Sequence, residues 1–187
     1  MTNIEAAKQT LGEEFAMFCE LLCQRIEAIK LPAGARVLDV GTGMGRAAIT
    51  LALCGFDVTT GEPADDQSAY ARQPWMDDAR RVGVDRAIQF RAFDASALPF
   101  EDGSFDALFM LGALHHMRDP QAVIDECIRV VRTAGALCIL EPTAQLVEHV
   151  RARHPDHPEP TDPRPLVPSM QVEHIGGEMM DTFIIRR

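Results

Sequence analysis

The sequence predicts an α/β protein with a doubly wound, mainly parallel sheet of seven strands and a C-terminal antiparallel hairpin. Short apolar segments alternate with amphipathic ones, and a glycine-rich turn closes the first apolar segment. The first crossover is long enough to join parallel strands, whereas the last two β-rich segments are separated by Gly176-Gly177, which favours a hairpin. The expected strands cover residues 36–40, 56–60, 88–91, 105–111, 136–140, 170–175 and 179–185.

Helices are expected between these strands. The clearest follows Asp119, a preferred N-cap residue, and places Pro120 at the first helical position; its apolar stripe ends before Gly135. At the N-terminus, apolar residues recur at steps of three and four until the chain reaches Pro32, which is typical of an amphipathic helix. The other expected helices cover residues 10–30, 46–54 and 75–82.

The 187 residues fit a single domain, residues 1–187, and 47% hydrophobic composition is enough for a substantial core. Six of the 12 prolines lie between positions 155 and 168, so this stretch is expected to be extended, after one or two helical turns at residues 146–153. The expected parts are an N-terminal helix (10–30), a core (36–142), a proline-rich connector or lid (143–169) and the hairpin (170–187).

Charge and composition exclude several classes of function. Eighteen Lys and Arg against 28 Asp and Glu give a net charge of −10, which disfavours nucleic acid as a partner. The longest apolar run, residues 107–114, is far shorter than the roughly 20 residues of a membrane span, and the first thirty residues lack the apolar stretch of a signal peptide.

Cysteine usage indicates a reducing compartment. Five cysteines, an odd number, lie mostly in apolar segments, so we expect reduced thiols in a cytoplasmic protein. Cys19 and Cys23 share a helix face, but no second Cys/His pair at ligand spacing supports a metal site there.

The glycine turn after the first strand carries the strongest functional signal. Such a turn lets the backbone bend sharply and approach a ligand closely. Asp39 precedes the turn, and Glu62, 21 residues after Gly41, ends the second strand, where a carboxylate can accept both hydroxyls of a ribose. The third glycine is not in the dinucleotide register, so a nicotinamide-dependent oxidoreductase is a weak alternative.

The segment Val37-Leu38-Asp39-Val40-Gly41-Thr42-Gly43-Met44-Gly45 resembles the first motif of the class I S-adenosylmethionine-dependent methyltransferases. Glu62 matches the ribose-binding acid of that family, Phe93-Asp94-Ala95 is similar to the adenine-binding segment, and Leu111-Gly112-Ala113-Leu114-His115-His116 is similar to the fourth-strand motif of the branch that includes ubiquinone/menaquinone methyltransferases. The resemblance covers residues 36–142. It implies a Rossmann-like methyltransferase fold, S-adenosylmethionine as cofactor and S-adenosylhomocysteine as product. The cofactor-binding residues that it implies are Asp39, Gly41, Thr42, Gly43, Gly45, Glu62, Asp94, Ala95 and Leu111.

The resemblance implies in-line (SN2) methyl transfer to a small-molecule acceptor. Holding the nucleophile about 3–3.5 Å from the methyl carbon supplies roughly 7–11 kcal/mol, so a base is needed only for a protonated acceptor. His115 and His116 are the candidate bases, because they follow the fourth strand on the ligand-binding edge; packing beside the cofactor or capping of the turn is the alternative. No metal is expected. His149, His154, His157 and His174 surround the proline stretch and are interpreted as part of a solvated loop rather than as ligands.

Several features depart from the family pattern or stay open. The turn before the fifth strand reads Arg132-Thr133-Ala134-Gly135 instead of Lys-Pro-Gly-Gly, Pro63 follows Glu62, and no Asn/Asp-Pro-Pro-Tyr signature follows the fourth strand. Tyr70 and Trp75 either stack on a ligand above Glu62 or pack a helix, and helix packing is favoured. The acceptor is not identified; a homodimer or a partner subunit could complete the pocket. The alternative function is a cofactor-binding regulatory subunit without catalysis.

Overall fold

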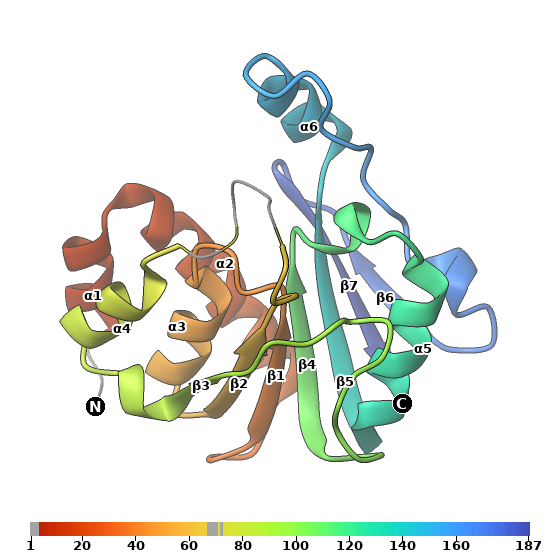
Figure 1. Ribbon diagram of the computed structural model, residues 1–187, viewed down its shortest axis with the longest axis horizontal. Helices are drawn as coiled ribbons and strands as arrows, with labels where there is room; N and C mark the ends of the chain where they lie inside the picture. Colours follow the sequence, from red (N-terminus) through yellow and green to blue (C-terminus); the bar gives the residue numbers. More distant parts are fainter. Residues whose placement is uncertain (1–3, 67–70, 72) are drawn as a thin grey trace.

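The computed structural model describes residues 4–66, 71 and 73–187, and its centre is a seven-stranded sheet of order β3-β2-β1-β4-β5-β7-β6 (Figure 1). β1 to β5 pair in parallel, and β7 is antiparallel to both β5 and β6. This confirms the predicted fold class. The strands are β1 (Arg36–Val40), β2 (Asp57–Gly61), β3 (Ile88–Phe90), β4 (Phe105–Leu111), β5 (Val131–Pro142), β6 (Val172–Ile175) and β7 (Met180–Arg186).

Helices cover both faces of the sheet. The helices α1 to α4 pack against one face of the sheet and form one apolar cluster with the strand side chains of that face. The helix α5 packs against the opposite face and forms the second cluster. Successive side chains of a strand point to opposite faces, so β1, β4, β5 and β7 contribute to both clusters. The helices are α1 (Ile4–Leu11), α2 (Glu13–Ile29), α3 (Arg46–Leu53), α4 (Trp75–Arg81), α5 (Pro120–Val130) and α6 (Ala144–Arg151), with 3₁₀ turns η1 (Asp85–Ala87), η2 (Leu114–His116) and η3 (Arg164–Leu166).

The N-terminal segment differs from the single helix expected over residues 10–30. The chain breaks at Gly12, whose φ of 92° is not helical, and forms α1 before it and α2 after it. Both helices contribute to the same apolar cluster. The apolar period therefore continues across the break, which is why periodicity alone did not reveal it.

The elements around β4 and β5 follow the prediction more closely. Asp119 caps α5 by accepting a hydrogen bond from Ala122 N, and Pro120 starts the helix as expected. The helix ends at Val130 rather than near Gly135, because β5 already begins at Val131 and pairs there with Phe105. The fifth strand is thus longer than predicted at both ends.

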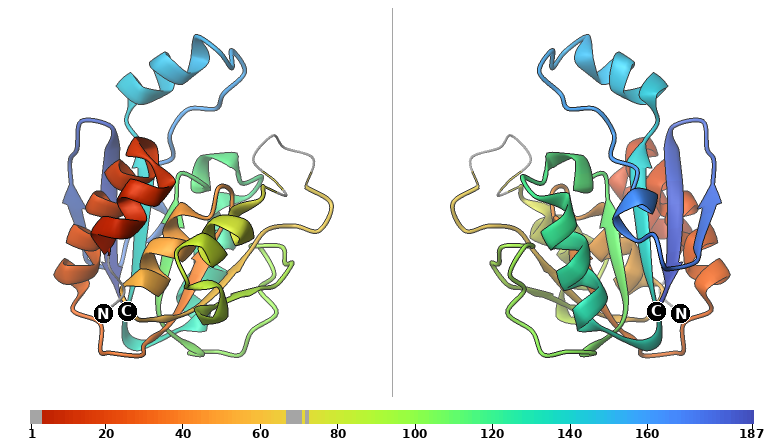
Figure 2. Two further views of the ribbon diagram at one scale, coloured as in Figure 1. Left: turned by 90° about the vertical axis from the view of Figure 1, so that its left-hand side faces the viewer. Right: turned by 90° about the vertical axis from the view of Figure 1, so that its right-hand side faces the viewer.

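The carboxyl ends of β1, β2 and β4 meet at the upper edge of the sheet in Figure 1, and the connector (residues 143–169) rises beyond this edge. Both side views in Figure 2 show α6 and the chain after it projecting from the same edge. Thr143 caps α6 through Leu146 N, and Arg151 Nε donates to the carbonyl of His157, 2.7 Å away. The connector therefore has internal structure and lies at the edge where ligands bind in parallel α/β sheets.

The state of the cysteines and the apolar character of the helices bear on the expectations from composition. All five cysteines are free; Cys19, Cys127 and Cys138 are buried, and Cys23 Sγ lies 4.0 Å from Cys54 Sγ. Among the described residues, no helix has both the length and the apolar character needed to cross a membrane.

Candidate functional site

The glycine turn between β1 and α3 is closely packed on two sides and open on a third. A Cβ at Gly41 would lie 2.8 Å from Ala113 Cβ, and a Cβ at Gly45 would lie 2.6 Å from Trp75 Cβ. At Gly43, with φ of 47°, no atom of the described residues lies within 4 Å of the corresponding position. The turn thus presents an open backbone surface at Gly43, where a ligand can approach.

Buried hydroxyl groups anchor this turn to the strands below it. Thr60 Oγ1 donates to Asp39 Oδ2 at 2.8 Å, so the hydroxyl of Thr42, 2.8 Å from Thr60 Oγ1, is the donor in the second bond. Asp39 Oδ1 is buried and has no hydrogen-bond partner among the described residues. Burial raises the pKa of Asp39 to about 7, opposed by the Thr60 hydrogen bond and assisted by the charge of Glu62.

Thr60 was not predicted from the sequence. It pairs in register with Asp39 on the neighbouring strand, so its role depends on strand register. A hydroxyl near the end of an apolar strand was the available signal.

Glu62 lies beside the glycine turn, as predicted. Its side chain is largely buried, and Oε2 accepts from Gly43 N at 3.3 Å. The carbonyl of Glu62 accepts from Phe93 N at 3.2 Å, which brings the segment that carries Asp94 and Ala95 to the end of β2. Asp94 is exposed, and hydrogen bonds from the Ser96 hydroxyl and backbone hold its pKa below the usual range. Three of the predicted cofactor-binding segments, namely the glycine turn, the end of β2 and residues 93–95, therefore meet at one edge.

The chain after β4 brings the two candidate bases to the same edge. Leu111 ends β4 and is partly buried; Gly112 N then donates to Leu140 O at 2.7 Å, and η2 carries His115 and His116. Because a Cβ at Gly41 would touch Ala113, the glycine turn and this segment are in direct proximity.

Glu141, near the end of β5, holds His115. The distance from His115 Nδ1 to Glu141 Oε2 is 2.9 Å, and each side chain is only 2% exposed. Glu141 also accepts from Leu114 N at 3.1 Å and from Thr161 N, in the connector, at 3.0 Å. A carboxylate accepts only, so Nδ1 carries the proton and Nε2 keeps its lone pair. His115 Nε2 is buried and has no hydrogen-bond partner within the described chain.

The sequence reasoning missed Glu141. An acidic residue near the carboxyl end of a fully apolar strand was a signal, because such a group needs donors. That strand was expected to end at residue 140, so Glu141 was not considered.

His157 of the connector joins the other two imidazoles. Its ring centroid lies 5.0 Å from that of His115 and 5.1 Å from that of His116, and the centroids of His115 and His116 are 4.1 Å apart. Partial burial and the neighbouring imidazoles lower the pKa of His116 to about 4. The interpretation of His149, His154, His157 and His174 as part of a solvated loop is therefore wrong for His157, because the connector folds back onto η2. It is also wrong for His149, which lies in α6, and for His174, which lies in β6 and stacks on Phe183.

Of the two aromatic residues between the second and third strands, Tyr70 and Trp75, the structure describes one. Trp75 is buried against Gly45 and lies 6.2 Å from the Phe90 ring, which confirms its predicted role in helix packing. Tyr70 lies outside the described residues.

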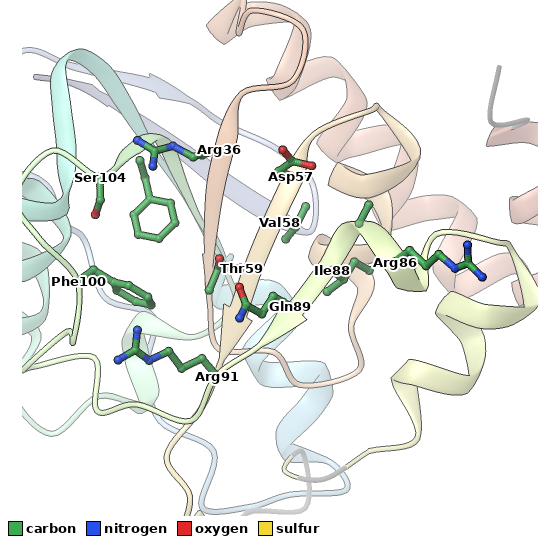
Figure 3. Close-up of a pocket in the computed structure, with 12 residues that line it drawn as sticks. Arg36, Asp57, Val58, Thr59, Arg86, Ile88, Gln89, Arg91, Phe100 and Ser104 are labelled. Atoms are coloured by element: carbon green, nitrogen blue, oxygen red, sulfur yellow. The ribbon is translucent and has the colours of Figure 1, made fainter.

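A cavity lies elsewhere, near the amino ends of β1 and β2 (Figure 3). Its volume is about 510 Å³, and it contains none of the predicted site residues. Figure 3 shows Arg91 beside Phe100, with its guanidinium 5.0 Å from the ring, and Arg86 pointing away from the cavity. In this fold ligands bind at the carboxyl edge, so the chemistry is expected at that edge.

Comparison with known proteins agrees with this placement. The family model described as "Methyltransferase domain" matches residues 38–139, which is more than half of the chain. The chain is 36% identical over 111 residues to 27-O-demethylrifamycin SV methyltransferase of Amycolatopsis mediterranei, covering 59% of this chain and 40% of that protein. It is 32% identical over 124 residues to demethylmenaquinone methyltransferase of Clavibacter sepedonicus, covering 66% of this chain and 48% of that protein. The chain thus spans less than half the length of these two relatives.

Structural similarity extends beyond the matched core. The crystal structure of a SAM-dependent methyltransferase from Aquifex aeolicus superposes with a TM-score of 0.66 over 88% of each chain, at 16% identity, which shows a shared fold. The matched residues contain the glycine turn, Asp39, Glu62 and Asp94, and the His-His segment of η2, but not Glu141. The chain belongs to the class I S-adenosylmethionine-dependent methyltransferase family.

Proposed function

We propose that the protein transfers a methyl group from S-adenosylmethionine to a small-molecule acceptor at the carboxyl edge of β1, β2 and β4. The observation that carries this proposal is the contact between the glycine turn and the segment after β4. A Cβ at Gly41 would lie 2.8 Å from Ala113 Cβ. The glycine turn, which is assigned to the cofactor, is therefore next to the segment that carries His115 and His116.

The residues present fit the cofactor. Glu62 has a carboxylate beside the turn for ribose hydroxyls, and the open backbone at Gly43 leaves room that a Cβ would fill. Asp39 Oδ1 is a buried acceptor to which no described residue donates, and it is suited to an ammonium or hydroxyl donor. Asp94 and the backbone of Ala95 are assigned to the adenine, while Thr42 and Leu111 line the turn and the end of β4. When bound, the cofactor supplies an electrophilic methyl group on a sulfonium.

The protein's own contribution is alignment and proton removal. Glu141 fixes the His115 tautomer with Nδ1 protonated, so Nε2 is free to take a proton from an acceptor hydroxyl or amine. His116 lies beside it and is assigned to acceptor positioning. Because the acceptor must reach a buried nitrogen, it is expected to be small or to enter past the connector.

The experiment that tests this proposal is calorimetric titration with S-adenosylmethionine, S-adenosylhomocysteine and, as a control, NAD. Micromolar binding of the adenosyl ligands supports the proposal, and an acceptor screen with radiolabelled methyl follows. Binding without any transfer would favour a regulatory subunit, and selective binding of NAD would favour an oxidoreductase.

Variants of the histidine side test the proton step. His115→Ala is expected to lower kcat by about 10²- to 10⁴-fold for a protonated acceptor. Glu141→Gln should lower kcat with little change in the Kd of S-adenosylhomocysteine, because it acts through His115. His154→Ala in the connector is the matched control. An unchanged kcat in His115→Ala would refute its assignment as the base.

Two further expectations concern the cellular setting. Five free thiols fit a reducing compartment such as the cytoplasm.

Among the described strands β6 pairs only with β7, so its outer edge is where a second copy or a partner subunit would add to the sheet. Gel filtration tests for a second copy, and pull-down tests for a partner subunit.

A further inference from the structure

Three histidines from two distant segments meet above the carboxyl edge of β4. One ring nitrogen from each of His115, His116 and His157 lies within 4.8 Å of the others. The first two belong to η2, and the third is carried by the connector, 41 residues later. Within the described chain this is the one group of metal-ligating side chains at such spacing.

In two of these imidazoles Nδ1 is hydrogen-bonded, which leaves the lone pair of Nε2 to bind a metal. His115 Nδ1 donates to Glu141, and His157 Nδ1 lies 3.0 Å from the carbonyl of Pro158, which can only accept. His115 Nε2 is buried without a hydrogen-bond partner among the described residues. Metal-binding histidines typically donate their second ring N–H to a carboxylate or a backbone carbonyl in this way.

We propose that His115, His116 and His157 form a binding site for a divalent transition metal of the zinc type. Imidazole nitrogen is a preferred ligand of Zn²⁺, whereas Mg²⁺ and Ca²⁺ require oxygen ligands, of which this set has none. Three protein ligands leave one tetrahedral position open, as in zinc sites that also bind a water or a small ligand. Metal binding does not depend on methyl transfer, so the site goes beyond the proposed function.

To bind one metal ion, the ring nitrogens of the three histidines must move closer together. With Zn–N distances of about 2.0–2.1 Å, tetrahedral ligand atoms are about 3.4 Å apart, so separations of up to 4.8 Å must shorten by as much as about 1.4 Å. Glu141 fixes His115, whereas the connector carries His157. The hydrogen bond from Arg151 to the carbonyl of His157 lies within the connector, so it does not hold His157 away from η2. The metal is therefore expected to draw the connector toward η2.

The experiment measures metal binding to the full chain after removal of metal with EDTA. Zinc is titrated calorimetrically, and cobalt(II) is added separately, because its visible absorption reports tetrahedral coordination. The variants are His157→Ala, which removes the ligand carried by the connector, and Glu141→Gln, which keeps the shape of the side chain while weakening the support of His115. His154→Ala is the matched control, because it removes an imidazole from the same connector outside the cluster. Circular dichroism confirms folding, and S-adenosylhomocysteine titration of the same samples reports the cofactor site.

The expected result is one zinc per chain, a tetrahedral cobalt spectrum, at least a hundredfold loss of affinity in His157→Ala and a 10- to 100-fold loss in Glu141→Gln. His154→Ala should bind zinc like the unsubstituted protein. Absence of stoichiometric zinc in the unsubstituted protein, or unchanged affinity in a folded His157→Ala, overturns the proposal. S-adenosylhomocysteine binding separates this outcome from failure of the proposed function, because it does not require the metal.

Discussion

Alanine at Gly43 tests whether the open side of the glycine turn receives the cofactor. Gly43 has φ of 47°, and within the described part of the chain nothing lies within 4 Å of an added Cβ. Left-handed backbone costs a non-glycine residue about 1–2 kcal/mol, which for a chain of this length lowers Tm by about 2–8 °C. The new methyl group also fills the space through which a ligand would touch the backbone. We therefore expect Gly43→Ala to fold and to bind S-adenosylhomocysteine at least about tenfold more weakly, equivalent to about 1.4 kcal/mol.

The matched control is Gly55→Ala. Gly55 has φ of 87°, and an added Cβ there also meets no described atom within 4 Å, but this residue follows α3 and precedes the amino end of β2, away from the site. It should lose similar stability and keep cofactor affinity within about twofold. Thermal unfolding and calorimetric titration of the two variants separate strain from binding. Equal affinities in Gly43→Ala and Gly55→Ala would refute the argument that the open face of the turn is a binding surface.

Three further predictions follow from the carboxylates and the histidines of the edge. Glu62→Ala should weaken S-adenosylhomocysteine binding by about 1–3 kcal/mol, or about 5- to 160-fold, while Asp57→Ala at the other end of β2 should not; calorimetry that finds no difference contradicts the ribose assignment. Asp39 loses its proton near pH 3.8 when unfolded and near pH 7 when folded, so the folded state binds more protons between these values. The free energy of unfolding should therefore fall by up to about 1.4 kcal/mol per pH unit from pH 4 to 7, and Asp39→Asn should flatten this slope in urea unfolding; an identical slope would contradict the burial argument. Zinc should slow methyl transfer to a protonated acceptor, because metal and proton use the same nitrogen of His115, and His157→Ala should resist this inhibition; equal inhibition of both proteins would show that zinc acts elsewhere.

The parts of the fold that could be predicted are those determined by local sequence. β1 and β4 have the predicted boundaries, because each is an apolar run that a glycine interrupts at its carboxyl end. The cap at Asp119 was predictable for the same reason, since the N-cap and the following proline are adjacent in sequence. The break at Gly12 was not, because the apolar period continues through it.

The site was predictable only where one segment supplies the chemistry. The glycine turn and Glu62 follow directly from a strand-turn pattern, and the structure brings them together. Thr60, Glu141 and His157 act through partners on other strands or on the connector, so their roles depend on register and on how the connector folds. Sequence spacing contains no information on either, which is why His157 was assigned to a solvated loop.

Glu141 couples the connector to the state of His115. Its buried carboxylate accepts three N–H groups from two separate segments, namely Leu114 N, the His115 ring and Thr161 N. A buried charge needs such donors to offset desolvation, and the one from Thr161 is worth about 1.5–3 kcal/mol, as expected of a hydrogen bond to a charged group. Lifting the connector would remove this donor and leave the carboxylate more dependent on the His115 N–H. The tautomer that leaves Nε2 free depends on the hydrogen bond between Glu141 and His115 and not on the connector, whereas the proposed metal site also needs His157 and therefore the connector in the position seen here. It follows that loss of the Thr161 contact should affect metal binding more than proton transfer from an acceptor.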